Sequence, residues 1–446
     1  MNKTESILKR DDKIISDVLK LRFFPTSIHK AKKSMLYDDD GKEYLDFNSG
    51  WGVANIGYCD ERFVETVNNQ MKELTSNCLI STSTKRAVEL AEKLTTLVPD
   101  GEKRKVWFGH SGSDANEFIA KVVPIATNRP RILSFIGSYH GQTMGAYSMS
   151  GHPSQGQFIS GGNIIKVPYP YCYRCPFGKI RNECNLFCAS YIEKYVLGMS
   201  YDPSQIGAMI FEAVISDGGD ITPPKEFFKA MEDIGKKHGI WLIADEVKIG
   251  FGRTGKMFGF EHFGINPDAV VVGKPIAGGL PLSAVIGRKE LMDAGYGMHM
   301  FTTAGDPISC SAALATIKII EDDGLVENAA YIGEYLLNKF LKLKEKYDCI
   351  GDVRGKGLIL GVEFVKNRQT KEPDSDMASM VVYSSYKQGL LYYYTGILGN
   401  VLELTPPLIL TIEEAKRAVD IIDKSIDNVI EGKITKDMLE GFSGWG

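Results

Sequence analysis

The sequence has no long apolar run and no feature of an exported or membrane-bound chain. No uninterrupted apolar stretch among the 446 residues approaches the roughly 20 that span a bilayer. The first residues lead directly into the charged run from Lys9 to Lys13, and no apolar segment of a secretory signal precedes it. We therefore expect a soluble, cytoplasmic protein without a membrane partner.

Neither charge sign is in large excess, and the chain has no internal repeat and no low-complexity tract. Lys and Arg number 52 and Asp and Glu number 56, for a formal net charge of -4. A surface that coats nucleic acid would need a basic excess. We therefore predict no nucleic-acid partner.

Cysteine is too sparse to form a disulfide framework, because only eight occur in the whole chain. Four of them are grouped as Cys172, Cys175, Cys184 and Cys188, a spacing compatible with metal ligands. No histidine joins the group, and a reduced, cysteine-rich surface loop is the simpler interpretation. We predict no bound metal, and a metal ion held by these four cysteines is the alternative.

Short apolar runs alternate with helical patterns through the middle of the chain. Runs that are apolar on both faces are typical of parallel strands covered by helices, which predicts an α/β fold with a mostly parallel sheet. The predicted strands are 106–108, 132–135, 208–211, 240–244 and 269–272.

The pattern of predicted helices and strands changes near residue 321. A long amphipathic helix (325–346) is predicted first, then a strand-rich piece (351–365), then a final helix from Ile412. The N-terminal segment contains a predicted hairpin near residues 37–46. We therefore divide the chain into an N-terminal segment (1–55) that joins a small domain, a large domain (56–320) and a C-terminal small α+β domain (321–446).

Polar residues follow the ends of several predicted strands, where ligands of open parallel sheets bind. Ser111, Gly112 and Ser113 come after the first strand and lead into a helix, so that small residues and a helix N-terminus could hold a phosphate. An ordinary turn before a helix is the alternative. Tyr139 follows the second strand and could stack on a flat ring, or simply pack.

Asp245 and Lys274 follow two later strands. A carboxylate at a buried strand end needs a cation, either a protonated pyridine nitrogen or a basic side chain. A buried lysine is costly unless its charge is paired or its amine is used, as in a Schiff base. Gly273 and the pair Gly278-Gly279 would allow a planar cofactor to approach. Together these signals predict a pyridoxal 5'-phosphate (PLP) site on Lys274.

The sequence resembles the class III aminotransferases, a subgroup of the fold-type I PLP enzymes. The resemblance runs from residues 44–47 to residues 405–408. It is most specific in Asp245-Glu246-Val247, Gly252-Arg253-Thr254-Gly255, Pro267-Asp268 and Gly273-Lys274.

The resemblance implies a role for each site residue. Lys274 would hold the cofactor and move the substrate proton, and Asp245 would pair with the pyridine nitrogen. The phosphate would lie on residues 111–113, and the ring between Tyr139 and Val247. Thr302 would reach the phosphate of a neighbouring subunit, which implies a homodimer with shared active sites.

Two residues depart from the family pattern. Lys248 stands where a neutral amide is usual, so that it either lies near the cofactor's ring oxygen or points to the surface. Glu403 stands where an arginine usually grips a substrate carboxylate. It either turns to solvent, pairs with a lysine, or receives an ammonium group of the substrate. We assign Glu403 and Glu212 to substrate binding.

Glu403 favours an aminotransferase that acts on a cationic acceptor. The expected substrate is an oxidised amino sugar of aminoglycoside biosynthesis, as in neamine transaminase, with glutamate as the expected donor. Arg253, Lys248 or Arg22 would then have to bind the carboxylate of the donor. A racemase or epimerase, similar to the isoleucine-epimerase branch, is the alternative, and a non-catalytic binding module is the alternative from another class.

Overall fold

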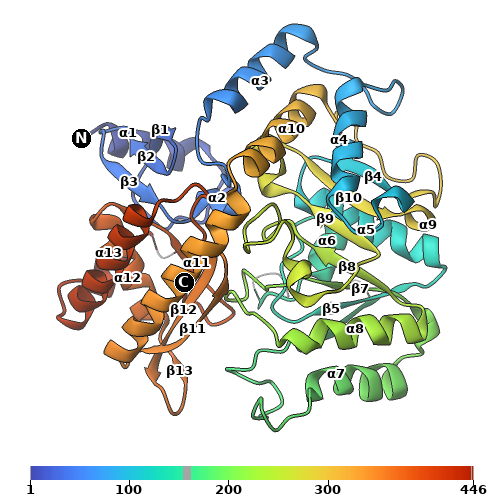
Figure 1. Cartoon of the computed structure of the whole chain (residues 1–446). Coiled ribbons are helices and arrows are strands. Elements are labelled where there is room, and N and C mark those ends of the chain that lie inside the picture. The colour runs from blue at the N-terminus through green and yellow to red at the C-terminus, as the bar shows by residue number, and fades with distance from the viewer. Residues whose placement is uncertain (1, 154–161, 443, 445–446) are drawn as a thin grey trace.

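The computed structural model describes residues 2–153, 162–442 and 444. Figure 1 shows two unequal halves: a large domain around an extended sheet, and a smaller half in which the N-terminal elements lie beside the C-terminal ones. None of the described helices is long and apolar enough to cross a membrane.

The large domain contains a seven-stranded sheet in the order β4-β10-β9-β8-β7-β5-β6. Its strands are β4 (Arg104–Gly109), β5 (Arg131–Phe135), β6 (Ile164–Val167), β7 (Ile206–Phe211), β8 (Trp241–Asp245), β9 (Ala269–Val272) and β10 (Ser283–Arg288). Strand β10 is antiparallel to both of its neighbours, and the other pairs are parallel. The chain therefore has the predicted α/β fold with a mostly parallel sheet.

Both faces of this sheet are buried, which is why its strands read as continuous apolar runs. All six residues of β7 are buried, with Ala208 and Ile210 in one hydrophobic cluster and Met209 and Phe211 in another. The first cluster includes Phe118 of α5, and the second lies against α8. The helices of this domain are α3 (Glu61–Glu73), α4 (Lys85–Thr96), α5 (Gly112–Thr127), α6 (Met144–Met149), α7 (Phe187–Tyr191), α8 (Lys225–His238), α9 (Lys289–Met292) and α10 (Pro307–Asp322).

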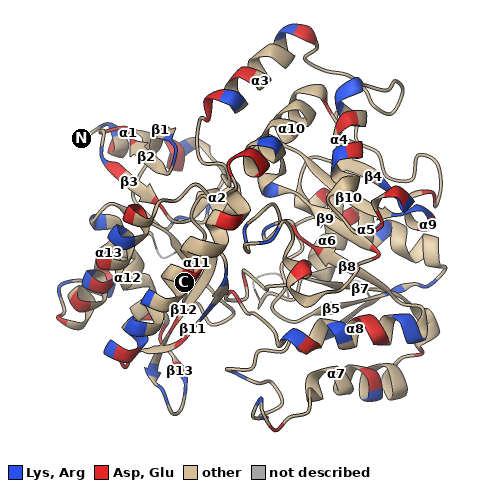
Figure 2. Ribbon diagram, viewed as in Figure 1, with Lys and Arg blue, Asp and Glu red and all other residues tan. Residues whose placement is uncertain are grey.

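The smaller half contains two sheets and three long helices. The C-terminal sheet has the order β11-β12-β16-β15, with β13 paired to β12. Its elements are α11 (Leu325–Lys346), β11 (Ile350–Lys356), β12 (Ile359–Asn367), β13 (Glu372–Pro373), α12 (Ser375–Lys387), β15 (Tyr393–Thr395), β16 (Val401–Leu404) and α13 (Ile412–Ile430). Charged residues are frequent along the helices, and the central strands of the large sheet carry few (Figure 2).

The N-terminal segment pairs with the C-terminal part of the chain. Its elements are α1 (Lys3–Ile14), β1 (Ile28–Lys32), β2 (Met35–Asp38), β3 (Glu43–Asp46) and the short α2 (Ser49–Gly52). Strand β3 lies parallel to β14 (Leu390–Leu391), so that Leu45 faces Leu390. This pairing is the basis for counting the N-terminal segment with the small domain, and the boundaries at residues 55 and 320 stay a proposal.

The five predicted strands correspond to β4, β5, β7, β8 and β9, and the long predicted helix corresponds to α11. The sequence analysis missed β6 and β10. β6 is a four-residue strand at the sheet edge, with buried residues at only two positions. β10 begins four residues after the glycine pair of the Lys274 loop, so no long helical segment separated it from β9 in the sequence pattern.

Candidate active site

A cavity of about 390 Å³ lies at the carboxyl ends of the central strands of the large sheet. The loops after β4, β5, β8 and β9 contribute Ser111, Tyr139, Asp245 and Lys274 to its lining. These residues are far apart in the sequence and meet because parallel strands end at one edge of a sheet.

Lys274 directly follows β9 and begins a short 3-10 turn. Its φ is +38°, an unfavourable value for a residue with a side chain. Desolvation lowers the pKa of its amine, and the nearby Lys248 cation lowers it further. The lining of the cavity therefore includes an amine that loses its proton more readily than an ordinary lysine.

Asp245 ends β8 and is only 3% exposed. One carboxylate oxygen accepts hydrogen bonds from Asn116 Nδ2 at 2.8 Å and from His140 Nδ1 at 2.7 Å. The other accepts the backbone N–H of Val247 at 3.0 Å. Three donors thus hold the carboxylate in one orientation at the cavity wall.

The loop between β4 and α5 has the features of an anion site. Ser111 caps α5, a helix of 16 residues, and the Ser113 hydroxyl accepts the backbone N–H of Gln142 at 3.0 Å. A Cβ atom at Gly112 would lie 2.6 Å from Val247 Cγ1, so only glycine fits there without a shift. Backbone N–H groups and the helix dipole favour a phosphate at this end of the cavity.

Tyr139, Val247 and Glu212 all line the cavity. Glu212 accepts the backbone N–H groups of Tyr139 at 2.8 Å and of Ser216 at 3.4 Å. Burial raises the pKa of Glu212 well above its usual value, and the Asp245 carboxylate adds to the effect. Through these contacts Glu212 holds the backbone of Tyr139 in place. The predicted contact of Glu212 with substrate stays a proposal.

Lys248 does not point to the surface. Its side chain is 5% exposed, and Nζ lies 2.9 Å from Asp217 Oδ1 and 2.8 Å from Glu403 Oε2. Burial acts to lower the pKa of Lys248, but the two carboxylates outweigh it and raise the pKa. The ammonium also lies 5.1 Å from the ring centroid of Trp51.

The predicted role of Glu403 must be revised. Its side chain is fully buried, it is absent from the cavity lining, and both of its oxygens contact Lys248. Ser216 Oγ also donates to Glu403, at 3.2 Å. The cation that Glu403 meets is therefore a lysine of the same chain, and the argument for a substrate ammonium group loses its basis.

Two arginines that were candidates for a substrate carboxylate lie elsewhere. Arg253 is fully buried and donates to Leu358 O, Pro406 O and Asn55 Oδ1. Arg22 pairs with Asp11 at 2.9 Å and borders a different cleft. Thr302 is exposed and lies outside the cavity lining, so its contact with a neighbouring subunit stays a proposal.

The sequence analysis missed the roles of Asn116, His140 and Asp217. Asn116 lies one helical turn into α5, and His140 lies next to the predicted Tyr139. Asp217 stands six residues after the end of β7 and lines the cavity. The turn-forming run Asp217-Gly218-Gly219-Asp220, placed after a buried strand, was the signal that could have revealed it.

The four grouped cysteines border one small cavity of about 30 Å³, beside Phe177 and Phe187. Their thiols are free. Within the described ranges, no cluster of three or more His, Cys, Asp or Glu residues is arranged to hold a metal ion.

The observed residues fit PLP. Asp245 is a fixed carboxylate for a protonated pyridine nitrogen, and His140 Nε2 and Asn116 Oδ1 beside it are buried without a partner among the described residues. The space over Gly112 suits a phosphate, and Lys274 provides an amine of lowered pKa. The cavity therefore has a polar partner for each end of the cofactor.

Comparison with known proteins assigns almost the whole chain to one family. The family model for class-III aminotransferases matches residues 18–426. A solved Bacillus anthracis aminotransferase superposes with a TM-score of 0.89 at 31% identity, covering 96% of this chain and 100% of that one.

The curated relatives include amino-acid racemases and epimerases. A leucine/methionine racemase of Thermococcus litoralis is 40% identical, covering 99% of each chain. An alanine/serine racemase of Pyrococcus horikoshii is 36% identical over 98% of this chain and 93% of its own. An isoleucine 2-epimerase of Lentilactobacillus buchneri is 35% identical over 100% and 99%.

These relatives correct one expectation from the sequence. They give no support to the predicted resemblance to neamine transaminase or to a place in aminoglycoside biosynthesis, and they support the alternative branch. The protein belongs to the class-III aminotransferase family of fold-type I enzymes, and its cofactor is pyridoxal 5'-phosphate.

Proposed function

We propose that this protein is a PLP-dependent racemase or epimerase of neutral α-amino acids. The observation that carries the proposal is that Asp217 and Lys274, two groups able to move a proton, line the same cavity. Racemisation removes the proton from one face of Cα and returns it on the other, so it needs a proton carrier for each face. The racemases and epimerases among the relatives support the same activity.

The charge around the cavity argues against glutamate as a substrate. Glutamate carries two carboxylates, and each needs a cationic partner when it is bound away from water. Lys248 is already paired with Asp217 and Glu403. A neutral amino acid has a single carboxylate and therefore needs only one cationic partner in the site.

Part of the cavity lining is apolar. Val53, Leu280, Pro281 and Leu282 line it. Such a wall stabilises an aliphatic side chain by about 25 cal/mol for each Å² removed from water and offers no partner to a charged one. This lining favours uncharged, predominantly aliphatic amino acids.

We assign the proton transfers to Lys274 and to Asp217, whose carboxylate lines the cavity and is paired with Lys248. When bound, PLP withdraws electrons from the substrate and makes the proton on Cα acidic. Asp245 is held by Asn116 and His140, and Glu212 is held by backbone N–H groups. We assign removal of the Cα proton on one face to Lys274 Nζ and on the other face to the Asp217 carboxylate.

Both assigned groups have pKa values suited to this role. Burial acts to raise the pKa of Asp217, but the cations of Lys248 and Lys274 outweigh it, so that the pKa is lowered and the group is ionised. The pKa of Lys274 is lowered by burial and by Lys248. Asp217 is therefore a carboxylate, and Lys274 gives up its proton more readily than an ordinary lysine.

The experiment follows both enantiomers of leucine with the holoenzyme in D₂O, measuring rotation by circular dichroism and Cα deuterium by NMR. We expect the parent to convert each enantiomer into the other. Asp217→Asn should lower the racemisation rate by about a hundredfold or more, because an amide cannot carry the proton. It should still exchange the Cα proton of the one enantiomer that faces Lys274.

Asp220→Asn is the matched control. Asp220 is fully buried, lies three residues from Asp217 and is absent from the cavity lining. Burial and the nearby Glu403 carboxylate raise its pKa well above the usual value, and an amide keeps the shape of the side chain. An Asp217→Asn enzyme that racemises like the parent would refute the two-residue assignment. A parent that converts to the pyridoxamine form with glutamate and racemises nothing would instead be an aminotransferase.

A further inference from the structure

A second cleft lies between the large and small domains and has a volume of about 580 Å³, larger than the 390 Å³ of the active-site cavity. The large domain contributes Arg181, the segment 222–225 and His262. The small domain contributes residues of α11 and the segment 353–356 of β11. The cleft is separate from the cofactor site, because the two share no lining residue.

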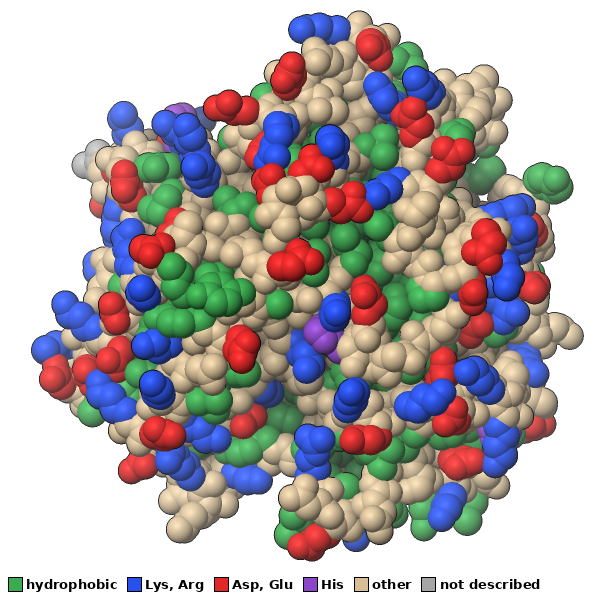
Figure 3. Space-filling view, in the orientation of Figure 1, with side chains coloured by type: hydrophobic (Ala, Val, Ile, Leu, Met, Phe, Trp, Pro, Cys, Tyr) green, Lys and Arg blue, Asp and Glu red, His purple; other side chains and the backbone are tan. Residues whose placement is uncertain are grey.

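The cleft is strongly basic. Arg181, Lys225, Arg354 and Lys356 line it, and no Asp or Glu is among its described lining residues. Arg181, Lys225 and Lys356 form no ion pair within the part of the chain that the structure describes. In the lower centre of Figure 3, Lys and Arg side chains lie on both sides of a hollow between two lobes of the surface. Grouped cations without carboxylate partners attract an anion.

Two further features of the same wall favour an anion. Helix α8 has 14 residues and begins at Lys225, and its N-cap Pro224 provides no side-chain hydrogen bond. The Phe227 N–H donates to Pro224 O, which leaves the N–H groups of Lys225 and Glu226 and the helix dipole for an anion. The hydroxyl of Thr222 is buried and has no partner among the described residues. Both donors lie on the side of the cleft where Lys225 stands.

We propose that this cleft binds a small molecule that carries a phosphate or diphosphate group and an apolar portion. The cations, the α8 N-terminus and the Thr222 hydroxyl would bind the phosphate oxygens. Leu337 and Leu341 of α11, with Phe263, line the cleft beside them and would contact the apolar portion. A simple inorganic ion would leave this apolar wall unused.

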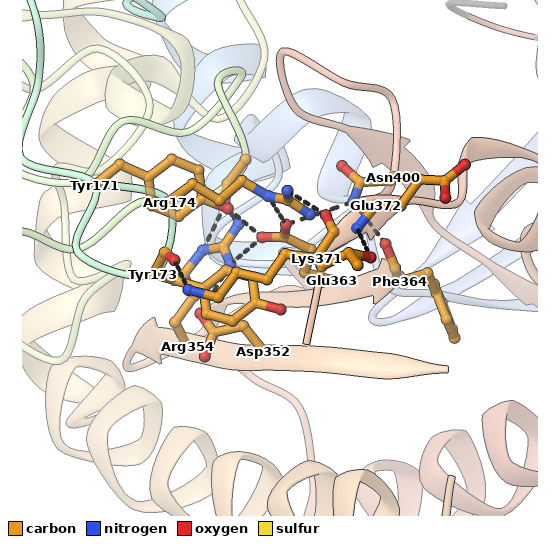
Figure 4. A network of polar contacts seen from close by, with 12 residues as sticks. Tyr171, Tyr173, Arg174, Asp352, Arg354, Glu363, Phe364, Lys371, Glu372 and Asn400 are labelled. Atoms are coloured by element: carbon orange, nitrogen blue, oxygen red, sulfur yellow. Dashed lines mark hydrogen bonds and ion pairs between the residues drawn. The ribbon is translucent and has the colours of Figure 1, made fainter. Parts of the chain in front are cut away.

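The cleft is connected to the active site through Arg354. Its Nε donates to Gly219 O at 2.9 Å, and Nη1 lies 2.6 Å from Glu363 Oε2. Figure 4 shows Arg354 and Glu363 within this network between the domains. Gly219 lies in the turn that carries Asp217, and Thr222 is five residues beyond Asp217, so that a bound anion contacts both ends of this connection. We infer that the bound ligand alters the turnover of the enzyme. The effect on turnover rests on the proposed function, and the binding of the ligand is independent of it.

The experiment titrates pyrophosphate into the holoenzyme by calorimetry at constant ionic strength. The cofactor is first fixed by borohydride reduction, so that pyrophosphate cannot displace it from the phosphate site. We expect one binding event per chain. Lys225→Ala and Lys356→Ala should each weaken it roughly three- to tenfold, the double variant should weaken it further, and Thr222→Val should weaken it about threefold.

Lys416→Ala removes the same charge from an exposed position of α13 that has no ion pair with any described residue, and should leave the affinity unchanged. Absence of binding at millimolar pyrophosphate, or equal weakening by Lys416→Ala, would overturn the site. In unreduced enzyme, pyrophosphate should change kcat/KM of the parent and not of the double variant. Binding with no such change would overturn the connection to Asp217 and leave the binding site standing.

Discussion

Lys248 and Glu403 depart from the family pattern together because they bind each other. The two residues are 155 positions apart, and Nζ lies 2.8 Å from both oxygens of the carboxylate. A buried ion pair adds little net stability over apolar residues of similar size, but removing one partner leaves a buried charge uncompensated. Lys248 and Glu403 therefore each need the other as a charged partner.

This pairing predicts a large coupling between variants. Glu403→Gln should lower the free energy of unfolding by about 3 kcal/mol, because Lys248 then keeps only Asp217 as a close charged partner. Lys248→Met should cost a similar amount, since Glu403 and Asp217 would face each other without a cation. The double variant Lys248→Met/Glu403→Gln should cost clearly less than the sum of the two, as measured by urea unfolding. Strict additivity would mean that the pair does not form in solution.

At the scale of one element, α8 combines a buried apolar face with a charged group at the border of that face. Phe227 and Phe228 are fully buried against the sheet. Glu232 is 7% exposed, and Oε2 lies 2.5 Å from Lys229 Nζ and 3.0 Å from Lys236 Nζ. Burial acts to raise the pKa of Glu232, but the hydrogen bonds from Lys229 and Asn266 outweigh it and lower the pKa from 4.5 to about 2.

A lowered carboxyl pKa makes a stability contribution that depends on pH. The folded chain holds the proton less tightly than the unfolded chain, so the contribution is present above pH 4.5 and is lost as the pH falls through about 2. Glu232→Gln should therefore lower the free energy of unfolding by about 1 kcal/mol at pH 7, since the lysine partners are half exposed. Urea unfolding curves of parent and variant should converge toward pH 2. A difference that stays constant over this range would show that Glu232 acts through packing alone.

At the scale of the whole molecule, a buried carboxylate fastens the two domains together. Glu363 of β12 is fully buried and accepts from Tyr171 and Arg174 of the large domain and from Arg354 of β11 (Figure 4). Burial acts to raise the pKa of Glu363, but the Arg354 cation and the other donors outweigh it and lower the pKa. The relative placement of the domains, and with it the cleft between them, depends on this carboxylate.

We predict that Glu363→Gln loosens the domain contact. The amide leaves two arginines without their shared anion, so the free energy of unfolding should fall by about 3 kcal/mol, and backbone amides of residues 171–174 should exchange hydrogen faster. Glu372→Gln is the control, because its pair with Lys366 is more than half exposed on both sides and should contribute at most about 1 kcal/mol. Equal effects of the two variants would mean that the network does not hold the domains together.

The features that the sequence predicted well are those encoded locally. Strands β7 and β9 are apolar at every position because both of their faces are covered, so each can be recognised from a few consecutive residues. Lys274 and Asp245 follow directly from such strands, and the family motif extends over the same residues. Helix α11 is recognisable because its apolar face repeats with the helical period.

The features that the sequence left open depend on residues that meet only after folding. Lys248 could lie near the cofactor or face solvent, and only the approach of β16 to the large domain placed Glu403 beside it. The same approach removed the predicted cationic substrate, because a buried carboxylate with a lysine partner has no need of a ligand. The basic cleft likewise has walls from residues 181, 222–225 and 353–356, which are brought together only by the docking of the two domains. Local periodicity determines where strands and helices form, whereas the partner of a buried charge is decided by whichever distant segment packs against it.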